Sequence, residues 1–162
     1  MRALRFWALV PVTAGSVGAL AMVPVGLAAL QVPGASANVY GELLARQLFG
    51  STTWSALFAV HLLVGWVAAT PLALAGWWVS RRAVAALGTG PALVAGLVYG
   101  AGMWLVVNSI MLPWAYRRAS PWTLGLPAIW PSLVVHLVYG GVTAYAVARA
   151  AGASDVQVGS AA

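Results

Sequence analysis

Long apolar segments alternate along this chain with short polar interruptions. The apolar runs lie near residues 6–30, 53–79, 91–113 and 127–149. A helix rises about 1.5 Å per residue, so about 20 apolar residues cross the roughly 30 Å hydrocarbon core of a bilayer. The pattern therefore predicts an all-α fold, an integral membrane four-helix bundle formed by residues 1–151. The small and polar residues 152–162 predict a disordered tail.

The longest polar interruption, residues 31–52, has an amphipathic pattern of its own. Its large apolar side chains fall on one side of a helix over residues 39–49, which predicts a short interfacial helix between the first two spans. Glu42 and Arg46 are four residues apart and can pair as a solvated surface pair. Alternatively, Glu42 approaches the membrane histidines described below as the nearest carboxylate.

The N-terminal segment permits two interpretations. Arg2 and Arg5 precede the first apolar run as in a secretory signal, and Ala35-Ser36-Ala37 could serve as a cleavage site. The run is about 25 residues long, however, and a signal core has roughly 7–15. Its length favours a retained first span over a cleaved signal peptide.

Composition supports a membrane protein and excludes several classes of function. Hydrophobic residues make up 62% of the chain and charged residues 6%, whereas soluble domains have about 25% charged residues. The net charge of +6 comes from eight arginines at the ends of the apolar runs, which suits membrane anchoring better than nucleic-acid binding. The chain has no Cys, which excludes disulfides, iron–sulfur clusters and Cys-based zinc sites.

The arginines also predict an orientation. With four spans and cytoplasmic termini, the inside segments hold Arg2, Arg5, Arg81, Arg82 and Arg149, and the outside segments hold Arg46, Arg117 and Arg118. Because inside segments are usually richer in Arg, this distribution predicts that both termini are cytoplasmic. The second and fourth spans then run parallel.

Intramembrane polar residues define the candidate site. His61 and His136 each lie about nine residues into a span, at a depth of about 14 Å. Asn108, near the end of the third span, reaches the same half of the membrane. Both histidines precede rows of small residues at four-residue spacing, which predicts that they face the bundle interior and lie near each other. The candidate residues are His61, His136, Asn108 and Glu42.

Short motifs in the second half of the chain resemble a known group of proteins. The third span ends in Asn108 and Leu112-Pro113, and the fourth begins with Leu126-Pro127 and continues through Trp130 to His136-Leu137-Val138-Tyr139-Gly140. Together with His61-Leu62-Leu63, this resembles the YagU-like and related bacterial four-helix inner-membrane proteins. Those proteins can carry a His near the position of Asn108. The resemblance implies a bacterial cytoplasmic (inner) membrane location.

Several roles for the two histidines remain open. They can brace helices, carry protons or a solute, or, as two axial ligands, hold a haem b. A divalent metal would have an incomplete set of ligands within one protomer. No catalytic triad or acid/base pair is present, so we do not expect an enzyme. The expected surroundings are the lipid bilayer and a homo-oligomeric or other membrane-protein partner, with the protein acting as a transport, stress-related or structural subunit.

Overall fold

The computed structural model describes residues 2–29, 31, 39–79, 81–86 and 88–159, and all regular structure among them is helical. The helices are α1 (Arg2–Ala29), α2 (Val39–Phe49), α3 (Trp54–Val79), α4 (Arg81–Ala86), α5 (Thr89–Met103), η1 (Trp104–Met111), α6 (Leu112–Tyr116), α7 (Pro121–Leu124) and α8 (Leu126–Gly159). In this part of the chain, four helical segments are long and apolar enough to cross a membrane: Trp7–Ala29, Trp54–Trp78, Thr89–Tyr116 and Leu126–Ala151. The predicted all-α membrane bundle is therefore confirmed, and each boundary lies within three residues of the expected one.

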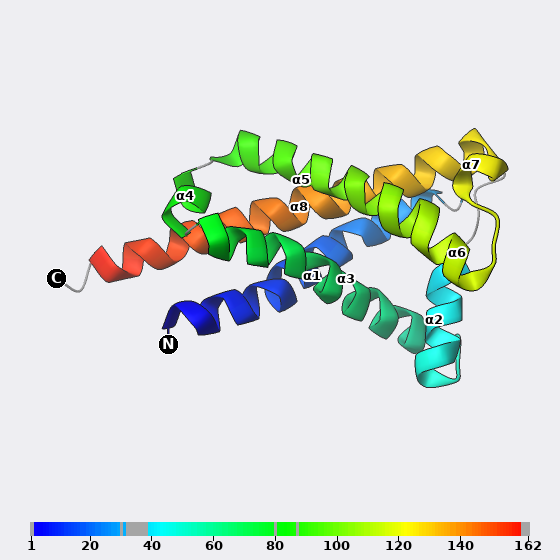
Figure 1. Ribbon diagram of the computed structural model, residues 1–162. Coiled ribbons are helices and arrows are strands. Elements are labelled where there is room, and N and C mark those ends of the chain that lie inside the picture. The colour runs from blue at the N-terminus through cyan, green and yellow to red at the C-terminus, as the bar shows by residue number, and fades with distance from the viewer. Residues whose placement is uncertain (1, 30, 32–38, 80, 87, 160–162) are drawn as a thin grey trace.

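The spans run in alternating directions. Both ends of the chain and α4 lie at one end of the bundle, and α2, α6 and α7 lie at the other (Figure 1). The spans α3 and α8 both start from the α2/α7 end, so they run parallel. His61 and His136 therefore lie in the same half of the bundle, as residue counting predicted.

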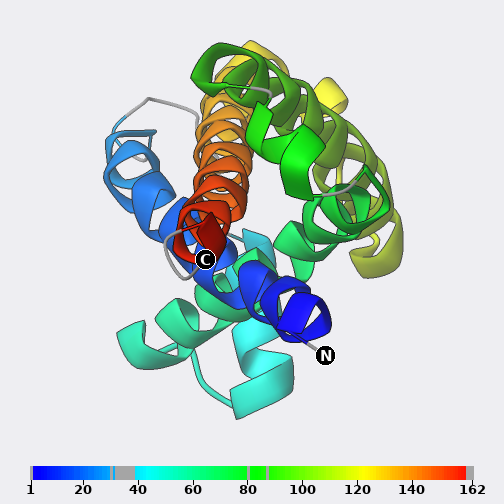
Figure 2. The same ribbon diagram turned by 90° about the vertical axis from the view of Figure 1, so that its left-hand side faces the viewer.

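Helix α1 lies between α3 and α8 (Figure 2). It crosses α3 where two glycines meet, because a Cβ atom added to Gly15 would lie 2.6 Å from the Gly65 carbonyl oxygen. It crosses α8 where Gly18 lies against Tyr139 and the fully buried Thr143. Small residues on two sides of α1 thus let it approach the backbone of α3 and accommodate large side chains of α8.

Helices α5 and α8 pack along an antiparallel row of residues at four-residue spacing. Gly96 lies against the backbone of Gly140, and Gly100 lies against the carbonyl group of His136. A Cβ atom on Gly96 would overlap the Gly140 carbonyl oxygen, so only glycine fits. The next pair in the same row is Trp104 and Ser132. The glycines therefore bring the helices close enough for polar side chains further along to meet.

The third span contains a π-helical stretch, η1, where the sequence predicted a continuous helix over 91–113. Ser109 donates a hydrogen bond through its hydroxyl to the carbonyl of Trp104 five residues earlier, at 3.1 Å. Trp104 and Asn108 are four residues apart within η1 and lie on the same side of the span, where both reach Ser132. Pro113 follows two residues after η1 and cannot donate a backbone hydrogen bond to Ser109, which favours the irregular ladder.

The short helix α2 forms at the predicted position and packs on the end of the bundle. Ala45 is fully buried against Ala56 and Val60 of α3. Tyr40 contacts the ring of Tyr116 at a centroid separation of 6.0 Å. This short helix therefore links the beginning of α3 to the end of the third span.

The C-terminal helix is longer than expected. Helix α8 continues to Gly159, whereas the composition predicted a disordered tail over 152–162. Each residue added to an established helix gains one backbone hydrogen bond without a new nucleation step. Residues 152–159 contain no proline that would end the helix. Residues 160–162 and the triplet 35–37, considered above as a cleavage site, lie outside the described residues.

Candidate functional site

Three side chains of the third and fourth spans gather at Ser132. The Nε1–H of Trp104 and the Nδ2–H of Asn108 both donate to the Ser132 hydroxyl oxygen, the latter at 3.1 Å. Trp104 is buried, and Asn108 and Ser132 are half-buried. With two donors at its lone pairs, the hydroxyl oxygen is fully used as an acceptor. We name Trp104, Asn108, Ser132 and His136 the Ser132 cluster.

His136 joins the Ser132 cluster through the backbone. Its Nδ1 lies 2.7 Å from the Ser132 carbonyl oxygen. A carbonyl oxygen only accepts, so Nδ1 carries the hydrogen and the neutral ring keeps the lone pair on Nε2. The ring is half-buried. This arrangement fixes one tautomer and leaves Nε2 as the nitrogen that can accept a proton.

His61 makes its hydrogen bond to another helix, unlike His136. Its Nε2 lies 2.7 Å from the carbonyl oxygen of Ala19 on α1, so this imidazole bridges two helices. One turn further along α3, the indole N–H of Trp66 donates to the hydroxyl of Ser16 at 2.8 Å. His61 therefore belongs to a pair of hydrogen bonds that fasten α3 to α1.

Two tyrosines that are not among the four candidate residues connect α3 to α8 and α5. The Tyr139 hydroxyl of α8 donates to the Gly65 carbonyl at 2.6 Å, and the Tyr99 hydroxyl of α5 donates to the Ala68 carbonyl. The sequence did hold a signal for them. The tetrapeptide Leu-Val-Tyr-Gly occurs at 97–100 and again at 137–140, each time ending in a glycine of the α5–α8 row.

The small-residue rows that follow the two histidines pack on different partners. Gly65 and Ala69 of α3 pack on Gly15 of α1, while Gly140 and Ala144 of α8 pack on Gly96 of α5. The expectation that these rows bring the two histidine helices onto each other was therefore wrong. Helix α1 occupies the position beside α3 that this expectation gave to α8 (Figure 2).

Of the four candidate residues, the structure brings Asn108 and His136 to the same serine and places His61 on α1. Glu42 is exposed on α2, as is Arg46, so a pair between them is a solvated surface pair. The buried face of α2 is centred on Ala45, and this contact holds the helix against the end of the bundle. Whether these residues act as a functional site stays a prediction.

Haem binding and metal binding are alternative roles for the two histidines. The Nε2 of His61 is already bound to the Ala19 carbonyl, so a haem held by both histidines would have to break this bond or use Nδ1. Within the described residues, no three side chains of the types His, Cys, Asp and Glu gather at one place.

Comparison with known proteins finds no matching family model, no matching curated protein and no matching solved structure. The resemblance to the YagU-like proteins therefore stays a prediction carried by the short motifs quoted above.

Proposed function

We propose that this membrane protein carries out proton-coupled transport and that His136 is the proton-binding group. The observation that carries the proposal is the convergence of Trp104, Asn108 and His136 on one residue, Ser132, inside the membrane-length part of the bundle. Intramembrane ionisable residues are costly to keep, and in transporters they commonly form proton relays. The Nε2 of His136 keeps its lone pair and gives the Ser132 cluster a group that can accept a proton.

The π-helical stretch supports the same proposal. Irregular turns of this kind occur frequently at functional sites, because the ladder of backbone hydrogen bonds can shift there at low cost. In this chain the stretch carries Trp104 and Asn108, two of the donors to Ser132. Ser132 links the two groups, because its carbonyl accepts from the His136 ring and its hydroxyl accepts from the Asn108 amide. We infer that protonation is coupled to the local conformation of η1.

We further propose that the membrane is a bacterial cytoplasmic membrane and that both termini are cytoplasmic. Arg2, Arg5 and Arg149 belong to the end of the bundle that holds the two termini. Arg117 and Arg118 are exposed at the opposite end. Reporter fusions after residue 82 and after residue 118 test this orientation, because they should give opposite signals. Equal signals would contradict it.

Histidine NMR tests proton binding directly. The chain contains two histidines, so protein labelled with ¹⁵N-histidine in bilayers gives two sets of ring signals, and His61→Gln assigns them. We expect His136 to change from its Nδ1–H tautomer to the doubly protonated form as the pH is lowered through the physiological range. A His136 signal that stays neutral from pH 8 to pH 5 contradicts the proposal.

Flux measurements test coupling. Protein reconstituted in vesicles with a trapped pH-sensitive dye receives an acid pulse, and His136→Gln is compared with His61→Gln at equal amounts of folded protein. Gln keeps the size of the side chain but cannot bind a proton. We expect His136→Gln to abolish protein-dependent proton flux and His61→Gln to retain it.

A structural role is the second candidate, and the hydrogen bond from His61 to α1 is the observation that favours it. If the protein only serves as a helical subunit of a larger complex, both histidines act as braces. Wild-type protein and both Gln variants would then show the same proton permeability as empty vesicles.

A further inference from the structure

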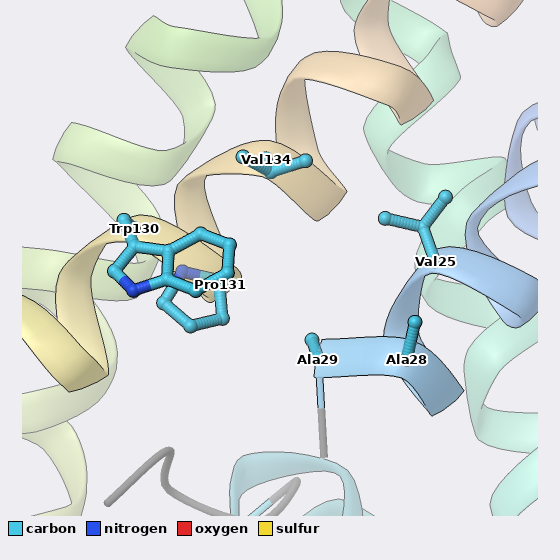
Figure 3. A pocket seen from close by; sticks show the side chains of 6 residues that line it. All are labelled: Val25, Ala28, Ala29, Trp130, Pro131 and Val134. Carbon is cyan, nitrogen blue, oxygen red and sulfur yellow. The ribbon is translucent and has the colours of Figure 1, made fainter. Parts of the chain in front are cut away.

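An apolar groove lies between the end of α1 and the beginning of α8. Its cavity volume is about 130 Å³. Val25, Ala28 and Ala29 of α1 face Trp130, Pro131 and Val134 of α8 across it, and Figure 3 shows the two sets of side chains on opposite walls. The lining is almost entirely apolar, with the indole N–H of Trp130 as its polar group, so a hydrocarbon group suits it best.

The crossing of the two helices explains why this groove exists. Helices α1 and α8 are in contact where the side chains of Thr143 and Tyr139 lie against Gly18. Ala28 lies ten residues beyond this point on α1 and Val134 nine residues before it on α8, a distance of about 15 Å along each axis. Two helices that cross at an angle diverge on moving away from the crossing. The alanines on the α1 side are too small to fill the resulting gap.

We propose that this groove binds one acyl chain of an anionic phospholipid. The groove belongs to two membrane-length helices and lies at the end of both spans, where α1 finishes and α8 begins. In a bilayer, this position is surrounded by lipid chains near their headgroups. Trp130, which lies at the groove, is 47% exposed, and tryptophan prefers this interfacial level.

The arginines at the same end of the bundle argue for an anionic headgroup. Arg117 and Arg118 are exposed in the connection that leads from the third span into α7 and α8, and Arg46 is exposed on the neighbouring helix α2. Among the described residues at this end, these three arginines outnumber one acidic residue, Glu42, so the charge of this end is positive. A phosphate diester with further negative charge complements this surface, and its acyl chain extends from there into the groove. The proposal does not depend on proton transport.

Lipid retention by the full chain tests the proposal. Purified protein in mild detergent is stripped of lipid, incubated with phosphatidylglycerol or with phosphatidylcholine of the same acyl chains, and examined by native mass spectrometry. We expect one retained phosphatidylglycerol and a preference over phosphatidylcholine of roughly fivefold for each arginine that contacts the headgroup.

Variants separate the groove from the headgroup site. Ala28→Trp and, from the opposite wall, Val134→Trp fill the groove and should abolish retention, while Ala75→Trp at an exposed position of α3 should leave it unchanged. Because Ala28 and Val134 are both exposed, these substitutions should not disturb the core. Arg117→Gln with Arg118→Gln should remove the preference for phosphatidylglycerol, and Arg149→Gln on the opposite end should not.

Three results would overturn the proposal. Equal retention of the two lipids by wild-type protein excludes recognition of an anionic headgroup. Retention that survives both groove-filling variants places the lipid elsewhere on the surface. A protein dimer that Ala28→Trp and Val134→Trp dissociate would show that a second copy of the chain, and not a lipid, occupies the groove.

Discussion

The two intramembrane histidines have similar sequence surroundings but make different contacts. Each lies four residues before a glycine that packs against a neighbouring helix, Gly65 after His61 and Gly140 after His136. His61 bonds across to the carbonyl of Ala19 on α1, whereas His136 bonds to the carbonyl of Ser132 in its own helix. The bonds between the third and fourth spans come from Trp104 and Asn108. His61 is therefore a brace, and His136 is a member of a polar cluster.

The difference shows that a glycine row fixes how closely two helices approach but does not fix what the polar residues beside it do. In the α1–α3 contact, the imidazole itself spans the interface. In the contact between the third and fourth spans, the indole of Trp104 and the amide of Asn108 bridge the two helices, and the imidazole of His136 does not. This comparison predicts different responses to substitution, and the largest should come from the glycines.

Gly96→Leu should have the largest effect on the α5–α8 contact. A Cβ atom there overlaps the Gly140 carbonyl oxygen and lies 2.7 Å from the Gly141 Cα. We expect a loss of roughly 3 kcal/mol in the free energy of unfolding, measured by denaturation from mixed micelles. Gly102→Leu is the control, because a Cβ atom at Gly102 meets nothing within 4 Å. Equal losses for the two variants would show that the α5–α8 row does not govern stability.

Ser132→Ala should have the next largest effect, because two donors lose their acceptor together. We expect about 1–3 kcal/mol less stability. Ser16→Ala is the matched variant in the α1–α3 contact, where the hydroxyl accepts from Trp66. Its loss should be smaller. If Ser16→Ala proves as costly as Ser132→Ala, the convergence of donors at Ser132 adds nothing to stability.

His61→Leu should reduce stability more than His136→Leu, whereas His136→Leu should reduce proton flux more than His61→Leu. Removing the bond from His61 to α1 should cost about 0.6 kcal/mol and at most about 1.7 kcal/mol, the range for hydrogen bonds between membrane helices. His136→Leu breaks a bond within one helix and should destabilise less, although it abolishes the proposed proton flux. Denaturation from mixed micelles measures the two losses in the free energy of unfolding. A larger loss for His136→Leu would contradict the different roles given to the two histidines.

The smallest effect on stability is expected in α2, which lies outside the contacts of both histidines. Burial raises the pKa of Tyr40 above its ordinary value of 10.0, and the nearby positive charge of Arg118 partly opposes this. The folded state thus favours the neutral phenol, so this stabilisation is present below pH 10 and is lost as the pH rises further. Tyr40→Phe should remove this alkaline dependence. The measurement is the free energy of unfolding of both proteins as a function of pH. An unchanged alkaline profile in the variant would contradict the assignment.

The hydrophobic pattern alone determined the fold class. Apolar runs of membrane length can satisfy their backbone groups only as helices when they cross a bilayer, so the number and positions of the spans followed from counting residues. The interfacial helix followed from its apolar face in the same way. Alternation of direction then placed His61, Asn108 and His136 in one half of the membrane.

Only the tertiary structure decided which helices meet. The glycine rows after His61 and His136 look equivalent in sequence, yet α1 packs on the first and α5 on the second. Helix rotation and neighbour choice depend on the packing of the whole bundle, and the period of a single helix does not contain that information. The role of Ser132 was hidden for the same reason. It is an ordinary serine in the sequence, and the close approach of the two spans at Gly100 brings Trp104 and Asn108 to it.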